Sequence, residues 1–305
     1  MRTDETGEGR QALKALARSI NRVLDRGGQA AGAIPGLMMF RQDTPTEPQS
    51  CMYEPSICLV AQGRKRVFLG EDSYVYDANN YLVSSLHMPG VVHILEASAE
   101  TPYLGLALRL DQRELAQLVL DSRLPPAPAQ APRRGMATGL TNVALLGAFQ
   151  RLIDLAAEAR DIPIMAPLIQ REILYRLLVG EQGDRLRQMV SAGTRTHQIA
   201  QAIGWLSAHF RSAVSIDELA ARVCMSSSAF YQHFRSMTAL SPLQFQKQLR
   251  LQEARRLMLE EGLEAATAAF EVGYESPSQF NREYNRLFGA PPLRDISSYR
   301  RAAAG

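Results

Sequence analysis

The chain has 305 residues, of which 46% are hydrophobic, with 34 Lys and Arg against 31 Asp and Glu. This length is comfortable for two domains, and the apolar content excludes a largely disordered chain. Three cysteines cannot form a disulfide framework, and no run of 18 apolar residues or apolar leader block appears. We therefore expect a cytoplasmic protein that does not enter a membrane.

The first 110 residues predict one helix followed by short strands. Apolar residues recur at helical spacing from about residue 10 to 26, where Gly27-Gly28 ends the pattern. From Gly36 onward the apolar runs are short, alternate with turn residues and have no helix between them. Strands of this kind are typical of a sandwich or a small barrel, which we place at about 36–110.

Helices are predicted after the strands. One runs from about 112 to 121, and a proline-rich stretch at 125–132 then forms an exposed connection. Two or three further helices follow, with broad apolar stripes at 143–155 and 168–178. We expect these stripes to pair with a second copy of the chain in a homodimer.

The overall prediction is an α+β chain of two domains. The first, residues 1–190, carries the barrel and then the helices at about 111–190. Small polar residues at 191–194 form the connection. The second domain, residues 195–305, is expected to be entirely helical, because its apolar residues recur with helical spacing throughout.

The segment from Ile216 to Phe288 contains the same helical unit twice, about 49 residues apart. Each copy has an apolar helical face, a tight turn and a second helix with a buried stripe, so each predicts a helix-turn-helix. The turns lie at Cys224-Met225-Ser226 and at Gly273-Tyr274-Glu275-Ser276. The buried stripes of the two second helices are Phe230, Phe234 and Met237 in the first copy and Phe280, Tyr284 and Leu287 in the second.

Each second helix has an outward face of short polar or basic side chains. Such side chains fit a B-DNA major groove, where they pair with base edges and phosphates. Ordinary solvated helix faces are the alternative, which a single isolated copy would favour, whereas two copies at matched spacing favour DNA binding. The residues predicted to contact DNA are Ser228, Tyr231, Gln232, Arg235, Arg255, Ser278, Gln279, Asn281, Arg282 and Arg286.

A long helix is predicted between the two copies. Ser241-Pro242 opens it, because serine caps a helix well and proline is tolerated in the first turn. From 242 to 260 such a helix spans about 28 Å, which would hold the two second helices roughly one DNA turn apart. Its basic residues, placed to reach phosphates, are Lys247, Arg250, Arg255 and Arg256.

The C-terminal part, roughly residues 196–300, resembles the DNA-binding domain of the AraC/XylS family of bacterial transcription regulators. The residues that carry the resemblance are Leu219-Ala220, Phe230, Phe234, Ser241-Pro242, Arg250, Ala254-Arg255, Leu257, Val272-Gly273-Tyr274, Ser276, Phe280, Leu287-Phe288-Gly289 and Pro291-Pro292. Ala239 departs from the pattern, since the family usually has glycine there, and the closing Tyr299-Arg300 comes late. The resemblance implies a sequence-specific regulator whose partners are double-stranded promoter DNA and RNA polymerase.

The front part resembles the cupin-like N-terminal domain of one branch of the same family. The stretches that carry this resemblance are 53–65, 82–85, 109–111 and 167–178. In that branch the domain receives a small signal or holds the dimer. The resemblance therefore implies that residues 1–190 form a sensor and dimerisation domain for a small organic effector. Activation is the expected mode, with repression left open.

Aromatic side chains on the strands point to an effector pocket. Alternation places Tyr74 and Tyr76 on one face of a strand, which points either inward or outward. Tyr81, His87 and His93 are the further candidates, and the two histidines could face a common pocket. No Arg or Lys is placed inside with certainty, so a neutral or weakly polar effector is expected.

Three alternatives accompany this interpretation. A cupin-type enzyme would need a His-x-His pair with a nearby Glu as metal ligands, which the strands lack, so we predict no metal, cofactor or catalytic residue. A helical adaptor without DNA contact would show no salt-dependent binding to duplexes. A redox or electrophile sensor at Cys51 is also open, whereas Arg64-Lys65-Arg66 is typical of a solvated basic run.

Overall fold

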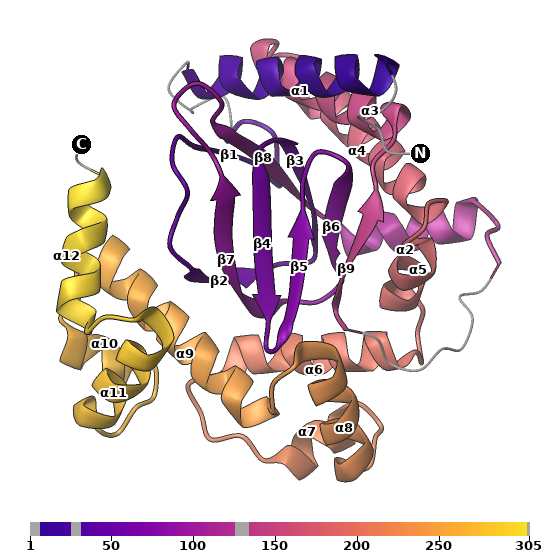
Figure 1. The fold of residues 1–305 in the computed structure, drawn as a ribbon. Coiled ribbons are helices and arrows are strands. Elements are labelled where there is room, and N and C mark those ends of the chain that lie inside the picture. The colour runs from indigo at the N-terminus through magenta and orange to yellow at the C-terminus, as the bar shows by residue number, and fades with distance from the viewer. Residues whose placement is uncertain (1–6, 26–31, 126–133, 304–305) are drawn as a thin grey trace.

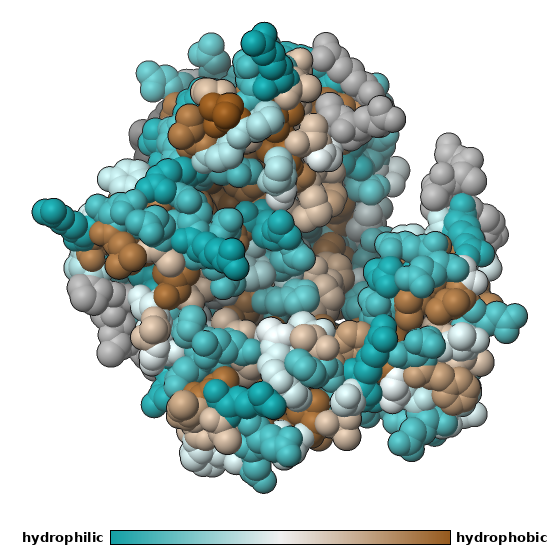
Figure 2. Space-filling view, turned by 180° about the vertical axis from the view of Figure 1, so that it is seen from behind, coloured by the Kyte–Doolittle hydropathy of each residue, from teal (hydrophilic) through white to brown (hydrophobic). Residues whose placement is uncertain are grey.

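The computed structural model describes residues 7–25, 32–125 and 134–303. The expected helix end at Gly27-Gly28 and most of the proline-rich stretch lie outside these residues. The strands form two facing sheets, with one group of helices packed on one side and the C-terminal helices along the opposite end (Figure 1). Seen from behind, the surface is hollowed between the sheets and the C-terminal helices, with apolar residues in the wall (Figure 2).

Both sheets are antiparallel, with strand orders β1-β8-β3-β6-β9 and β2-β7-β4-β5. Alternation along β3 explains why the sheets enclose an interior. Ile57 and Leu59 pack on the helical layer, whereas Cys58 and Val60 point between the sheets. The predicted barrel fold is confirmed, but β9 lies beyond the expected range of 36–110, in a region predicted to contain helices only. Its strands are β1 Leu37–Gln42, β2 Gln49–Tyr53, β3 Ser56–Gln62, β4 Arg64–Leu69, β5 Asp72–Tyr76, β6 Asn80–Ser84, β7 Met88–Glu96, β8 Tyr103–Arg109 and β9 Met136–Leu140.

A layer of helices covers the outer face of the five-stranded sheet: α1 (Gly7–Asp25), α3 (Val143–Asp154) and α4 (Ile162–Leu178) (Figure 1). A short 3-10 turn, η2 (Leu155–Ala157), lies between α3 and α4. The apolar stripe of α4 is buried within this chain at Ile169, Ile173, Leu174, Leu177 and Leu178. Most of the stripe that we expected to pair with a second copy is therefore part of the chain's own core.

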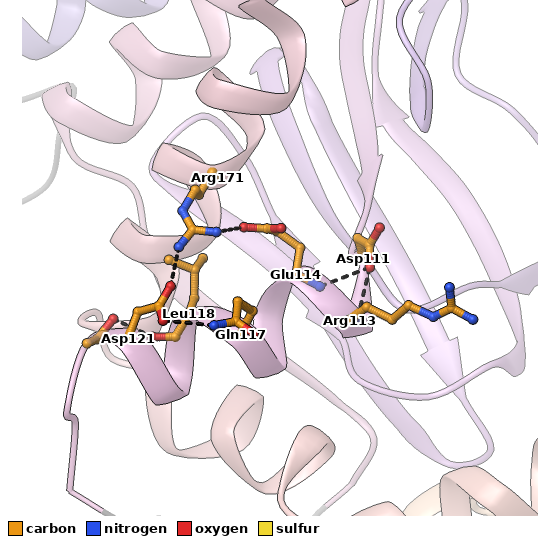
Figure 3. A network of polar contacts seen from close by, with 8 residues as sticks. Asp111, Arg113, Glu114, Gln117, Leu118, Asp121 and Arg171 are labelled. Carbon is orange, nitrogen blue, oxygen red and sulfur yellow. Dashed lines mark hydrogen bonds and ion pairs between the residues drawn. The ribbon is translucent and has the colours of Figure 1, made fainter. Parts of the chain in front are cut away.

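Helix α2 (Gln112–Asp121) is held by a polar network that includes Arg171 of α4 (Figure 3). The carboxylate of Asp111 caps the helix by accepting from the backbone N–H groups of residues 113 and 114, at 2.8 and 3.1 Å. The Arg171 guanidinium pairs with Glu114 and, at 2.6 Å, with Asp121. Helix α5 (Gly183–Val190) packs beside α2 and ends the N-terminal domain.

The C-terminal part is helical and contains the two predicted helix-turn-helix units joined by a 19-residue helix, α9. Serine caps α8, α9 and α11, and the α9 cap is a full capping box with Gln244. The predicted two-domain fold is thus confirmed. The helices are α6 Arg195–His209, α7 Ile216–Arg222, α8 Ser227–Thr238, α9 Pro242–Glu260, α10 Ala265–Glu271, α11 Pro277–Phe288 and α12 Pro292–Ala303.

The repeat extends to the backbone conformation of each unit. Cys224 and Gly273 occupy the same place in the two turns and have φ angles of 55° and 89°. Ala239 and Gly289 end α8 and α11 with φ angles of 64° and 75°. Both positions need the left-handed region, which glycine adopts without cost, so the first unit has a strained residue at each place.

The two helix-turn-helix units differ in how they are packed. Side chains of α6, α7 and α8 share one continuous apolar core with the interior of the barrel, including Val60, Leu86, Ile203 and Phe230. The second unit, α10 to α12 with the end of α9, has a separate core around Phe280. The first unit is consequently joined to the barrel by burial of apolar surface, and the chain at 191–194 does not mark a break in the core.

Candidate nucleic-acid interface

The faces of α8 and α11 that we expected to contact DNA lie on the surface. Phe230 and Phe234 are buried beneath α8, and Phe280 and Tyr284 beneath α11, so the polar residues between them must point outward. Helix α8 directly precedes the N-terminal end of α9, whereas α11 packs against the middle of α9, and both lie on the side away from the helical layer (Figure 1). The exposed residues are Ser228, Tyr231, Gln232, Arg235, Ser278, Gln279, Asn281, Arg282 and Arg286.

Arg255 is placed differently from the sequence expectation. Its guanidinium forms a two-pronged ion pair with Asp295 of α12, with both N···O distances 2.8 Å, and the side chains are only 12% and 10% exposed. Tyr284 donates to the same carboxylate at 2.7 Å, and the rings of Phe288 and Tyr299 lie 4.5 and 4.4 Å from the guanidinium. Arg255 therefore holds α12 on α9, and we withdraw it from the DNA face.

The other basic residues of α9 are also engaged within the chain. Lys247 pairs with Glu283 at 2.7 Å, and Arg256 pairs with three glutamates at 2.9 to 3.0 Å. Arg250 donates to the backbone carbonyls of Phe210 and Gly273 at 2.7 and 2.8 Å. The expectation that α9 presents its cations to phosphates is therefore not met. The cations of the two exposed faces are Arg235, Arg282 and Arg286, none of which forms an ion pair within the described residues.

The C-terminal end of α8 is held by the N-terminal domain. Arg134, which precedes β9, forms an ion pair with Asp72 at the start of β5. The same guanidinium donates to the carbonyls of Arg235 and Ser236 at 3.1 and 2.8 Å. A cation at the C-terminal end of a helix also interacts favourably with the helix dipole. The sequence carried no signal for Arg134, because its partners lie 62, 101 and 102 residues away along the chain.

Two backbone contacts complete this attachment. The N–H group of Gly135 donates to the carbonyl of Met237 at 2.8 Å. The turn between β4 and β5 approaches so closely that a Cβ on Gly70 would lie 2.6 Å from the Cβ of Ala239. We call these contacts of Gly70, Arg134 and Gly135 with residues 235–239, together with the Arg134–Asp72 ion pair, the latch. The alanine that departs from the family pattern therefore lies where the barrel meets α8.

The candidate effector residues are distributed over different surfaces. Tyr76 is buried and Tyr74 is half-buried on the same, inward face of β5. Tyr81 lies on the outward face of β6 and packs into the helical layer, so it does not line the interior. Burial raises the pKa of Tyr81 to about 12, with Glu181 adding to the effect. Its assignment to the pocket was wrong because alternation on β6 places Leu82, not Tyr81, inward.

The two histidines do not face a common pocket. His93 lies on β7 opposite Arg66 and points away from the interior, since its neighbours Val92 and Ile94 point inward. His87 precedes β7 and lies against α6, where Nδ1 is 3.3 Å from the hydroxyl of Ser207. Six residues of extended chain separate the two side chains by about 20 Å.

Lys65 is a residue of the interior that the sequence interpretation missed. It shares the inward face of β4 with Val67 and Leu69. Its ammonium lies 5.8 Å from the ring centre of Phe40 and 5.9 Å from that of Tyr53. The alternation of β4 could have found it, but the flanking arginines made the run look solvated.

The surroundings of Lys65 combine open apolar surface with buried polar groups. Met38 and Phe40 are 47% and 41% exposed, although their neighbours Leu37 and Met39 pack on the helical layer. Burial raises the pKa of the Cys51 thiol to about 11, with Lys65 opposing this, so Cys51 is protonated at neutral pH. A protonated thiol is a poor nucleophile, which argues against Cys51 as a redox or electrophile sensor.

Within residues 7–25, 32–125 and 134–303, no group of three or more His, Cys, Asp or Glu side chains has an arrangement able to hold a metal ion. None of the helices in these ranges is long and apolar enough to cross a membrane.

The barrel with its helical layer and the two helix-turn-helix units with exposed polar faces are those of a two-domain DNA-binding regulator. Comparison with known families agrees. The model of the AraC-type transcriptional regulator N-terminus matches residues 33–185, which is half of the chain, and a helix-turn-helix domain model matches residues 219–300. The chain belongs to the AraC family of transcription regulators. The predicted family and the predicted class of function are thereby confirmed.

Curated relatives match parts of the chain. The HTH-type transcriptional regulator CdhR of Pseudomonas aeruginosa is 27% identical over 164 residues, which cover 54% of this chain and 47% of CdhR. The HTH-type transcriptional activator RhaS of Escherichia fergusonii is 29% identical over 140 residues, which cover 46% of this chain and 49% of RhaS. The chain thus spans about half the length of the curated relatives that it matches.

Solved structures support the fold over most of the chain. ToxT of Vibrio cholerae, bound to a naphthalenyl butenoic acid, matches with a TM-score of 0.61 at 9% identity and covers 85% of this chain and 97% of ToxT. Another ToxT structure, bound to an unsaturated fatty acid, matches with a TM-score of 0.58 at 7% identity over 85% and 94% of the two chains. At this identity the match establishes a shared two-domain arrangement.

Proposed function

We propose that this protein binds double-stranded promoter DNA through α8 and α11 and regulates transcription in response to a small organic effector. The observation that supports this most directly is the repeated unit, whose two copies are joined by α9 and each present an exposed polar helix face. A 19-residue helix spans about 28 Å, close to one turn of B-DNA, so α8 and α11 can enter successive major grooves. The family consists of transcription regulators, and we propose no catalytic role for the chain.

The proposed mechanism is a change in how α8 is held. The shared core and the latch attach the first helix-turn-helix unit to the barrel, whereas the second unit has its own core. A ligand that binds the barrel more tightly in one arrangement of the first unit shifts the equilibrium toward that arrangement. The second unit touches the barrel through α11 beside β2 and through Gln252 of α9, which donates to Ser50 of β2 at 3.0 Å, and within the described residues it shares no apolar core with the barrel.

The effector site is proposed at the Lys65 side of the barrel interior. The exposed inward side chains of Met38 and Phe40 provide apolar surface, and Lys65 provides one ammonium. The buried hydroxyls of Tyr53 and Tyr76 lie near each other without a hydrogen bond of good geometry among the described residues, and an effector with a polar group would supply one. ToxT, which shares the fold, has been solved with two carboxylic acids. We therefore propose an apolar effector with one carboxylate, in place of the neutral effector expected from the sequence.

We also propose how the protein assembles, which partner it contacts on DNA and where it acts in the cell. Helix α4 leaves an exposed apolar row of Ile164, Leu168, Tyr175 and Val179, which is suited to a homodimer contact. RhaS is named an activator, which supports activation, and we propose RNA polymerase as the partner that the DNA-bound protein contacts. Such a regulator would work in the cytoplasm.

A binding selection from random duplexes with the full-length protein tests the proposal. Gln232→Ala on α8 and Arg282→Ala on α11 should each lose about 1 to 3 kcal/mol of base discrimination, at positions roughly one DNA turn apart. Arg18→Ala on the exposed side of α1 is the control, because it removes the same charge as Arg282→Ala far from both helices. If both substitutions changed the same base pair, or neither changed any, the two-groove arrangement would be rejected.

A further inference from the structure

A cavity lies between the barrel and α6, away from Lys65. It has a volume of about 260 Å³, near the lower end of the range of small-molecule sites. Its walls come from the β2–β3 turn, the β6–β7 loop, the end of β8, the start of α2 and one side of α6. The lining residues are Glu54, Pro55, Ser85, Leu86, His87, Arg109, Leu110, Gln112, Ala200, Ile203 and Gly204. We call it the α6 cavity.

No neighbouring atom in the described chain requires glycine at position 204, in the wall of the α6 cavity. Gly204 lies inside α6, where glycine stabilises a helix less than alanine does. A Cβ at Gly204 would have no heavy atom within 4 Å, so a side chain is not excluded by any neighbour in the described chain. Glycine at this position leaves the α6 wall of the cavity open.

The rim of the cavity carries one charge of each sign. The carboxylate of Glu54 and the guanidinium of Arg109 are 3.9 Å apart, and both side chains are at least half exposed. The pair is too loose for a hydrogen bond. Both residues belong to stretches that carried the family resemblance, yet neither has a part in the proposed DNA or effector contacts. His87 lies beside them, and burial lowers its pKa, so it adds no charge at neutral pH.

The chemistry of the rim selects the class of ligand. A simple anion near Arg109 would be repelled by the carboxylate of Glu54, and a simple cation near Glu54 would be repelled by the guanidinium of Arg109. A compact molecule with adjacent charges of both signs satisfies the two residues together. Leu86, Leu110 and Ile203 form an apolar part of the lining that can accept a hydrocarbon side chain.

We infer that the α6 cavity is a ligand site for a small zwitterion with an apolar side chain, of the class of the free aliphatic amino acids. The ligand would touch the barrel through Glu54 and Arg109 and the first helix-turn-helix unit through α6. Its binding free energy would then favour the arrangement in which that unit packs on the barrel, as in this structure, which we call the docked arrangement. This inference goes beyond the proposed effector site, and only its regulatory consequence rests on the proposed function.

Trp205 provides a local readout. It is the only tryptophan of the chain and follows Gly204 on α6. The probes are leucine, 4-methylpentanoate and 3-methylbutylamine, which share the hydrocarbon group and carry both charges, only the carboxylate and only the ammonium. Titrated at millimolar concentrations into the full-length protein, leucine should change Trp205 fluorescence and raise the melting temperature. The two single-charge probes should bind at least tenfold more weakly.

Substitutions locate the site. Gly204→Leu should abolish the leucine response by filling the α6 cavity, whereas Gly204→Ala leaves room for the ligand and should keep it. Arg109→Gln and Glu54→Gln should each weaken leucine binding at least tenfold, and they keep the test valid if Gly204→Leu fails to fold. No response to leucine, equal responses to all three probes, or a response kept in the rim variants would overturn the inference. DNA binding by the same samples separates this failure from failure of the proposed function.

Discussion

Removal of the latch arginine is the most direct test of how the sensor holds α8. Arg134→Ala deletes the ion pair with Asp72 and two hydrogen bonds to the end of α8. Hydrogen bonds from a charged group are worth about 1.5 to 3 kcal/mol, but the Arg134 and Asp72 side chains are 36% and 42% exposed, which reduces this value. We expect a loss of about 1 to 2 kcal/mol of docking free energy, which corresponds to a roughly 5- to 30-fold shift in the docked-to-undocked ratio.

Amide hydrogen exchange of the full-length protein measures this shift. In Arg134→Ala, amides of α8 near Thr238 should exchange faster by about that factor, while amides of α11 should be unchanged. Arg256→Ala is the matched control, because it removes an arginine whose three carboxylate partners all lie on α9 or directly after it. Unchanged exchange in α8, or equal acceleration in α8 and α11, would refute the reasoning. The affinity for a two-site duplex should change by no more than the same factor, since a perturbation shifts an equilibrium only by its own free energy.

Three further predictions concern stability and assembly. Arg255→Ala leaves Asp295 buried without its partner and should destabilise the second unit by about 3 kcal/mol in thermal melts. A flattened salt dependence of DNA binding without loss of stability would contradict this. Cys224→Gly should stabilise the protein by about 1 kcal/mol, because glycine adopts the positive φ of this position without steric strain, whereas Cys224→Ser should leave stability unchanged. Equal effects of the two substitutions would point to the thiol instead. Leu168→Glu on α4 should convert a dimer to a monomer in sedimentation while Leu293→Glu does not, and a monomeric wild-type chain at micromolar concentration would remove the dimer proposal.

Local patterns were sufficient to predict the elements and the repeat. The spacing of Phe230 with Phe234 and of Phe280 with Tyr284 follows the helical period, so it determines which side of α8 and α11 is buried without reference to the rest of the chain. Serine caps and turn residues are equally local, and they set where α8, α9 and α11 begin. The outward polar faces follow from the same periodicity, which is why nine of the ten predicted DNA-contacting residues lie on the surface.

Only the tertiary structure decided which charged and aromatic side chains are already engaged. Arg255 has the same local pattern as a phosphate-contacting arginine, but its partner Asp295 is 40 residues away. Tyr81 was misplaced because alternation shows which side chains share a face and not which face is inside, whereas Lys65 was missed because the flanking arginines made its run look solvated. The latch and the lining of the α6 cavity both bring together residues that are far apart in the sequence. Such contacts arise from packing between domains, and no short-range pattern encodes them.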